Sequence, residues 1–196
     1  MPDSTRHELD RRIARRVRDL RASLGLSLEA LAARSGVSRS MISLIERGES
    51  SATAVVLDRL ASGLGVSLAS LFDAPAAQPA PVARAADQPW WRDPASGYRR
   101  RNVSPSGFPS PIRIVEIVFP PGARVAYETG PREPRMHQQV WVLEGRIDVT
   151  VGEEQNVLNA GDCLALVLDR PVVYRNRTRR PARYAVVITS QFLPGG

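Results

Sequence analysis

The stretch LSLEALAARSGVSRSMISLIERG, residues 26–48, contains two short helical patterns joined by a turn. Ser27 and Ser38 each stand one residue before a pattern, where a serine hydroxyl can cap the free amides at a helix start. Gly36 and Gly48 stand where the patterns stop, and glycine readily takes the left-handed conformation that ends a helix. This spacing predicts a helix-turn-helix, a motif whose second helix enters the major groove of DNA by its N-terminal end.

Further helical patterns flank this stretch on both sides. Before Gly25, apolar residues recur every three or four positions, which predicts an amphipathic helix. These residues are Leu9, Ile13, Val17, Leu20 and Leu24. A fourth helix is expected near residues 54–64, and a short fifth helix after Ser67. Residues 1–73 are therefore predicted to form a compact all-α DNA-binding domain of five helices.

The composition changes after Asp73, at a segment rich in alanine and proline. Residues 74–89, APAAQPAPVARAADQP, lack the apolar side chains of a core and predict an extended linker. Beyond it, turn residues separate strand-length runs rich in β-branched and aromatic residues, which are IRIVEIVFPPG, QQVWVLEG, RIDVTVG, CLALVLDRP, VVYRN and ARYAVVITSQF. Residues 90–196 are predicted to form an all-β antiparallel sandwich or jelly roll.

The overall composition restricts the classes of protein and of partner. The 196 residues contain no apolar run of the roughly 18 to 20 residues that span a bilayer, so no membrane partner is expected. No secretory signal is visible, and the cytoplasm is the expected location. The single cysteine, Cys163, excludes an internal disulfide and a zinc site of several thiolates. The net charge is +7 and all 27 basic residues are arginine, which favours a polyanionic partner.

Residues 16–50 carry a pattern known from bacterial regulators. The pattern has Leu-Arg before the first loop, Gly-Leu-Ser at the start of the second helix, Gly-Val-Ser at the turn and Glu-Arg-Gly after the third helix. Over residues 13–72, the chain resembles the phage-repressor-type, or XRE, family of transcriptional regulators. This resemblance implies that a homodimer binds a double-stranded DNA operator, with half-sites about 34 Å apart.

The resemblance to XRE regulators also implies which side chains read the bases. Arg39 and Ser40 stand at the start of the recognition helix, where members of the family reach base edges, and Ser43 lies one turn further along. Arg39 is the leading candidate for direct readout, because a guanidinium can donate two hydrogen bonds to guanine O6 and N7.

Two further sets of residues follow from the same resemblance. Ser27 and Ser38, with the amides at their helix starts, are expected to hold DNA phosphates, and Arg47 is a further phosphate candidate. Arg21 and Glu46 are expected to form an ion pair between the first and third helices, with a structural role.

The strand region carries a second pattern, in the segments VWVLEG (140–145), AGDCLAL (160–166) and PVVYRN (171–176). Over residues 112–192 the chain resembles the cupins, β-barrels of jelly-roll topology, and an XRE head joined to a cupin is a known architecture of sensor-regulators. Metal-binding cupins place His-x-His, Glu and a final His on inward-facing strands. Here Gln138 and Val172 stand at the positions of the Glu and the final His, and residues 131–134 contain no histidine. The resemblance therefore predicts a domain without metal or cofactor.

Strand alternation suggests a different kind of pocket. If Gln138 faces inward, Val140 and Val142 face inward with it, and Val172 and Tyr174 can share that orientation from another strand. An apolar lining with one amide and one phenol suits a small organic effector.

Other arrangements of this region stay open. Tyr127, Glu133 and His137 lie nearby in the chain, with their facing undetermined. A rearranged metal site of Glu133, His137 and Gln138 would need a bulge, because neighbours on a strand point to opposite faces. The inward residues could also form a filled core that binds no ligand.

We interpret the chain as a sequence-specific DNA-binding regulator whose cupin domain senses a small molecule without metal, and not as an enzyme. One alternative is a metal-dependent cupin enzyme with an appended DNA-binding head. The other is an antitoxin-like repressor whose barrel only dimerises and senses nothing.

Overall fold

A computed structural model describes residues 3–73, 80–130 and 135–191 of the chain. The chain divides into two compact units, Met1–Ala76 with Asp93–Ala95 and Ala77–Arg92 with Ser96–Gly196, called here the helical unit and the β unit. The linker limits expected at residues 74–89 remain a prediction, because residues 74–79 lie outside the described part. None of the described helices is long and apolar enough to cross a lipid bilayer.

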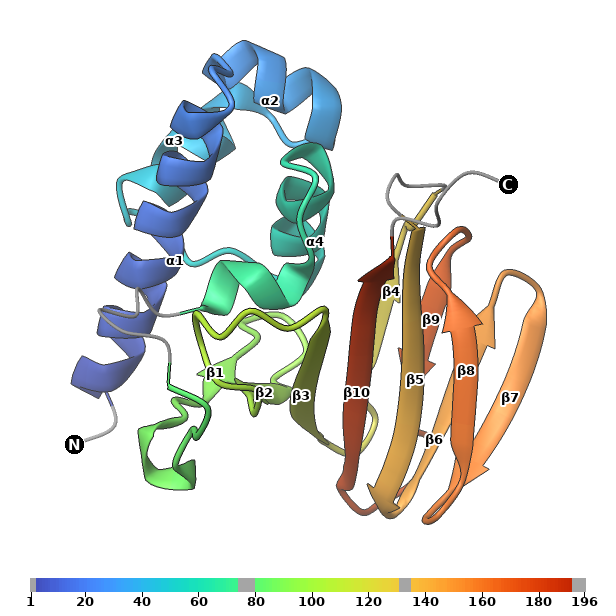
Figure 1. Ribbon diagram of the computed structural model, residues 1–196. Helices are drawn as coiled ribbons and strands as arrows, with labels where there is room; N and C mark the ends of the chain where they lie inside the picture. Colours follow the sequence, from blue (N-terminus) through green and yellow to red (C-terminus); the bar gives the residue numbers. More distant parts are fainter. Residues whose placement is uncertain (1–2, 74–79, 131–134, 192–196) are drawn as a thin grey trace. The chain divides into compact units, whose positions relative to one another are not determined.

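The helical unit contains four α-helices and one 3₁₀ helix in its described residues (Figure 1). These elements are α1 (Asp3–Ser23), α2 (Leu28–Ser35), α3 (Arg39–Glu46), α4 (Ala54–Gly63) and η1 (Leu68–Phe72). The five-helix prediction is wrong in its last member, because η1 is a 3₁₀ helix and not an α-helix. In η1 the amides of Ser70 and Asp73 donate to the carbonyls of Ser67 and Ser70, at 3.0 and 3.4 Å. This tighter bonding is common in segments of a few residues.

Side-chain caps fix the starts of the second and third helices. Ser27 and Ser38 accept hydrogen bonds from the amides of Ala30 and Met41 at 3.0 and 3.3 Å, which confirms the two expected caps. Gly36 ends α2 with a left-handed φ of 66°. The turn between α2 and α3 is therefore bounded by a glycine stop and a serine start.

The core of the helical unit draws apolar side chains from every helix. The most deeply buried are Val17, Leu31, Ile42, Leu57, Leu60 and Leu71. Helices α2 and α4 approach closely at Gly63, where a Cβ atom would lie 3.0 Å from Ser35 Cβ and 3.1 Å from Leu31 Cδ1. Because Gly63 has no side chain, Leu31 and Ser35 of α2 can pack directly against the backbone of α4.

The β unit contains ten strands and one short 3₁₀ helix in its described residues (Figure 1). The first elements are η2 (Ala85–Asp87), β1 (Trp91–Arg92), β2 (Arg99–Asn102), β3 (Ile112–Phe119), β4 (Arg124–Tyr127) and β5 (Arg135–Glu144). The others are β6 (Arg146–Val151), β7 (Glu154–Asn159), β8 (Cys163–Val167), β9 (Val172–Arg175) and β10 (Ala182–Gln191). All strand pairs are antiparallel, as expected from the many short runs in the sequence.

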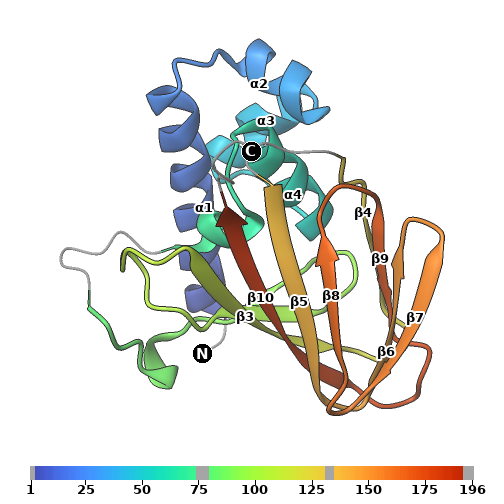
Figure 2. The same cartoon turned by 45° about the vertical axis from the view of Figure 1, so that its right-hand side comes forward.

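The strands form two sheets, one of six strands in the order β1-β2-β3-β10-β5-β8 and one of four in the order β4-β9-β6-β7. No hydrogen-bonded strand pair joins the two sheets in the described residues, so the prediction of a closed barrel is wrong in this respect. Strands β8 and β7 end their sheets, and Figure 2 shows β10, β5 and β8 of one sheet apart from β9 and β7 of the other. An open sandwich and a closed barrel show the same alternation of inward and outward residues, which explains the error.

Aromatic side chains fill much of the interior of the β unit. The ring centroid of Phe119 lies 5.9 Å from that of Tyr98 and 6.0 Å from that of Tyr184. Tyr184 in turn stacks on Tyr174 at 5.9 Å, with an angle of 3° between the ring planes. All four side chains are buried, so this cluster forms the centre of the β-unit core.

Asn176 fixes the turn that follows β9 and is fully buried. Its Nδ2 donates to the carbonyls of Phe119 and Arg180 at 3.1 and 2.8 Å. Its Oδ1 accepts from the amide and the hydroxyl of Thr178 at 2.9 and 2.8 Å. One side-chain amide therefore connects the end of β3 to the loop between β9 and β10.

We expect Asn176→Ala to lower the free energy of unfolding by about 3 kcal/mol, because several polar groups around the turn would lose their partner. Urea denaturation followed by circular dichroism measures the change. Asn159→Ala is the control, because Asn159 is an exposed asparagine in β7, and this change should cost less than about 0.5 kcal/mol. Equal effects of the two changes would show that the Asn176 network does not stabilise the β unit.

Candidate DNA-binding surface and ligand pocket

The first turn of α3 is exposed to solvent. Ile42 and Ile45 are buried in the helical core, and they lie three positions apart on one face of the helix. This orientation leaves Arg39, Ser40 and Met41 exposed. The exposed end of α3 is the part of a helix-turn-helix that meets base edges.

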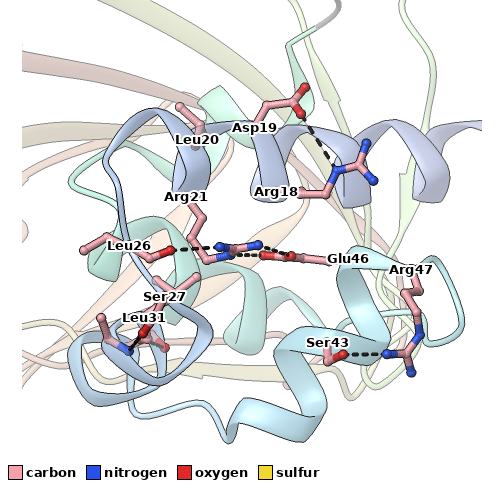
Figure 3. Close-up of polar contacts among 12 residues, drawn as sticks. Arg18, Asp19, Leu20, Arg21, Leu26, Ser27, Leu31, Ser43, Glu46 and Arg47 are labelled. Atoms are coloured by element: carbon pink, nitrogen blue, oxygen red, sulfur yellow. Dashed lines mark hydrogen bonds and ion pairs between the residues drawn. The ribbon is translucent and has the colours of Figure 1, made fainter.

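The two arginines expected at the DNA are each paired with a carboxylate. Arg39 Nε lies 2.5 Å from Glu29 Oε1, which belongs to α2. Arg47 Nε and Nη2 donate to the two carboxylate oxygens of Glu49 at 2.7 and 2.9 Å. Arg47 Nη1 donates to Ser43 Oγ at 2.5 Å (Figure 3). Ser43 is therefore occupied by Arg47 in the free protein.

The two serines expected at DNA phosphates are exposed and cap their own helices. Ser27 Oγ accepts from the Ala30 amide, and Ser38 Oγ accepts from the Met41 amide and lies 3.2 Å from Ser40 Oγ. Both residues stand at helix N-termini, where the remaining free amides and the helix dipole favour an anion.

Arg21 connects the elements that carry this surface. Its Nε and Nη2 donate to the two carboxylate oxygens of Glu46 at 2.6 and 2.8 Å, and its Nη1 donates to the Leu26 carbonyl at 2.8 Å (Figure 3). The side chains of Arg21 and Glu46 are 18% and 7% exposed. The hydrogen bond with Glu46 raises the pKa of Arg21 above its usual value. Arg21 therefore stays charged while it joins α1, α3 and the loop before α2.

Sequence reasoning missed two residues of this surface, Met41 and Glu29. Met41 is 38% exposed, and the helical period that buries Ile42 and Ile45 could have predicted its position. Glu29 gave no such signal, because its partner Arg39 lies in a different helix and only the packing of α2 beside α3 brings the two side chains together.

The predicted alternation is present in β5 and β9. Gln138, Val140 and Val142 of β5 are buried on one face, and Val172 and Tyr174 of β9 are buried as well. Gln138 Nε2 donates a hydrogen bond to the hydroxyl of Tyr174. The amide and the phenol expected to meet a ligand therefore contact each other.

Tyr127 lies next to Tyr174 and contacts a further tyrosine, Tyr98. Its hydroxyl lies 3.2 Å from the Tyr98 hydroxyl, and its ring meets Tyr174 edge-on at 6.1 Å. Burial raises the pKa of Tyr127 and that of Tyr184 well above their usual values. Both phenols therefore stay neutral at physiological pH, and the Tyr127 hydroxyl shares a hydrogen bond with Tyr98.

The residues at the metal positions of the cupins do not fit a metal. Val172 has no donor atom, and the Gln138 amide is engaged by Tyr174. His137 lies on the opposite face of β5 from Gln138, because strand residues alternate. The described part of the chain contains no group of three or more His, Cys, Asp or Glu side chains that could hold a metal. Glu133 lies outside the described residues, so the rearranged site that includes it is untested.

A pocket of about 430 Å³ lies beside Gln138, with walls from β5, β6, β7 and β8. Its lining combines apolar and polar side chains, among them Val151, Leu164, Leu166, Glu154, Asn156, Arg170, His137 and Gln138. His137 Nε2 is buried and has no hydrogen-bond partner within the described residues. Of the expected pocket residues that the structure describes, His137 and Gln138 line this pocket, whereas Tyr127, Val140, Val142, Val172 and Tyr174 do not.

Comparisons with known proteins agree with the geometry of α2 and α3. The HTH_3 family of helix-turn-helix domains matches residues 17–71. The HTH-type transcriptional regulator SutR of Escherichia coli (strain K12) is 30% identical over 172 residues, which cover 86% of this chain and 89% of SutR. The chain belongs to the XRE-type family of helix-turn-helix transcriptional regulators.

Solved structures are similar to this XRE-type regulator as well. An HTH_3 family transcriptional regulator from Vibrio cholerae has a TM-score of 0.76 and 26% identity, over 94% of this chain and 98% of that one. The cupin domain of an XRE family regulator from Enterobacter cloacae has a TM-score of 0.41 and 21% identity, over 48% of this chain and 97% of that one. The similarity to the Vibrio cholerae protein extends over the helical and the strand-rich parts of the chain.

In this XRE-type regulator, we expect Arg21→Ala to lower the free energy of unfolding by about 2 kcal/mol. The change leaves the mostly buried Glu46 carboxylate and the Leu26 carbonyl without their partner. Arg18→Ala is the matched control, because Arg18 lies on the same helix, is 56% exposed and only approaches Asp19 at 4.0 Å. Thermal denaturation compares the two variants, and equal melting temperatures would contradict a structural role for Arg21.

Proposed function

We propose that this XRE-type regulator acts in the cytoplasm as a homodimer, binds a double-stranded DNA operator through α3 and senses a small molecule in its β unit without metal. The exposed first turn of α3 carries the proposal, because Arg39 and Ser40 stand there clear of the core. Similarity to transcriptional regulators over most of the chain supports a role in binding and not in catalysis.

Base readout and phosphate contact fall to different residues in this proposal. Arg39, with Ser40 beside it, reads base edges, and a guanidinium fork matches guanine O6 and N7. Phosphates are held by three other residues. Ser27 and Ser38 stand at the N-terminal ends of α2 and α3, and Arg47 directly follows α3. Ser43 supports Arg47 from within α3.

We expect Arg39→Ala to remove sequence discrimination without changing the melting temperature, because the side chain is 65% exposed. The probe is a duplex selected from random DNA by the wild-type protein, compared with duplexes in which single G·C pairs of the half-site are changed. The preference for the selected duplex should fall about tenfold or more. Arg34→Ala removes the same charge from an exposed site in α2 and should leave that preference intact. A normal preference in Arg39→Ala would rule out readout by Arg39.

The pocket beside Gln138 supports the sensing part of the proposal. Val151, Leu164 and Leu166 supply apolar contact, and Asn156 supplies a polar group. A small organic molecule with several polar groups suits such a lining.

We expect a screen of small metabolites to find compounds that raise the melting temperature of the wild-type protein. A ligand at about 100 times its Kd stabilises the folded state by about 2.7 kcal/mol. Val151→Trp should fill the pocket and abolish the shift, whereas Val157→Trp, at a 44% exposed position of β7, should retain it. A shift that survives in Val151→Trp would exclude this pocket. A screen without any stabilising compound would favour the antitoxin-like alternative.

Homodimerisation is part of the proposal because operators of this type are read by two-fold dimers. The outer face of the six-stranded sheet offers two large apolar side chains for contact. Trp141 is 49% exposed there, beside Cys163 of β8 and Ala185 of β10, and Ile112 is 46% exposed. A ligand would then regulate binding only through its different affinities for the DNA-binding and the non-binding states of the dimer.

A further inference from the structure

Glu29 lies in the first turn of α2 and pairs with Arg39 at the start of α3. Glu29 Oε1 lies 2.5 Å from Arg39 Nε, and both side chains are 65% exposed. An ion pair so open to water contributes little to folding stability. Its position at the end of α3 that faces DNA suggests a role in recognition.

We propose that Glu29 is a positioning residue that holds Arg39 in the orientation for guanine. The inference rests on the proposed readout by Arg39. Glu29 engages the inner nitrogen, Nε, and the terminal pair Nη1 and Nη2 donates to guanine O6 and N7. Arginine has many rotamers, and a side chain that is already oriented loses less conformational entropy when it binds.

The charge of Glu29 makes this support selective. A backbone hydrogen bond, with smaller contributions from Arg39 and Ser27, lowers the pKa of Glu29, so the carboxylate is charged at neutral pH. A carboxylate near the DNA backbone is repelled by phosphates at every sequence. The Glu29 carboxylate assists binding only where Arg39 contacts a guanine. Because the repulsion acts at every sequence and the assistance only at guanine, Glu29 raises specificity.

Glu49 provides an internal comparison on the same surface. It binds Arg47 through two hydrogen bonds that use both Nε and Nη2, and it is exposed like Glu29. Arg47 is expected at a phosphate, which is the same at every base pair. Removal of Glu49 should therefore change the affinity for all duplexes alike, whereas removal of Glu29 should also change their ranking.

The experiment uses the full-length protein with Glu29→Ala, Glu29→Gln, Glu49→Ala and Arg39→Ala. Fluorescence anisotropy at fixed salt gives Kd for a duplex selected from random DNA by the wild-type protein, and for duplexes in which each G·C pair of the half-site becomes A·T. We expect Glu29→Ala to reduce the preference for one G·C pair by about threefold to tenfold. This loss is smaller than the full discrimination that a bidentate arginine–guanine contact provides. Glu29→Gln keeps an acceptor for Arg39 and should fall between Glu29→Ala and the wild type. Glu49→Ala should shift Kd for all duplexes by one common factor.

The outcomes separate this inference from the proposed readout. If Arg39→Ala loses the preference and Glu29→Ala keeps it, Arg39 reads DNA without help and the positioning role is wrong. If Glu29→Ala, like Glu49→Ala, changes Kd for all duplexes by one common factor, Glu29 acts only through its charge and the inference is wrong. A normal preference in Arg39→Ala, or no enriched duplex in the selection, would defeat the proposed readout and the inference with it. Adding Glu29→Ala to Arg39→Ala should cause no further loss of preference, because the side chain that Glu29 orients is gone.

Discussion

The ion pair of Arg21 and Glu46 links α3 to α1, and the proposed DNA-binding surface on α3 depends on this link. Three nitrogen atoms of Arg21 donate to the end of α3 and to the loop before α2. A charge that is mostly buried needs hydrogen bonds to offset its desolvation, and here both carboxylate oxygens of Glu46 accept from Arg21. Arg47 follows Glu46 directly, so the Arg21–Glu46 ion pair also positions the backbone from which the Arg47 side chain extends.

In the β unit, the corresponding constraint is the register of β5 from Arg135 to Val142, which lies before the irregularity at Arg183 and Tyr184 of β10. This strand pairs with β10 on one side and β8 on the other, so the buried face that includes Gln138 and Val140 is fixed. The amide of Gln138 meets Tyr174, and Tyr174 stacks on Tyr184. The positions at which the cupin resemblance would place metal ligands therefore belong to a neutral polar and aromatic core, and the pocket lies beside Gln138, toward β7 and β8.

Local signals in the sequence predicted much of this structure. The caps at Ser27 and Ser38 and the alternation around Gln138 depend on neighbouring residues, so a single sequence reveals them. The type of the fifth helix was not predictable, because five apolar-rich residues fit a 3₁₀ turn as well as an α-helix. The open edge between the two sheets and most of the pocket were missed because they depend on which strands become neighbours. Asn156 and Leu166 come together only through the placement of β7 and β8 in separate sheets.

The proposed roles of Arg39 and Arg47 offer a way for a weakly charged domain to bind DNA selectively. Residues 3–73 contain eleven arginines and nine carboxylates, so the net charge gives only modest attraction to phosphates. Arg39 and Arg47 are each paired with a glutamate before DNA arrives. Each glutamate partly neutralises its arginine, which reduces the gain from phosphate contact at random sequences. A contact that also supplies the hydrogen-bond pattern of a base keeps its advantage, and discrimination comes from this difference and not from total charge.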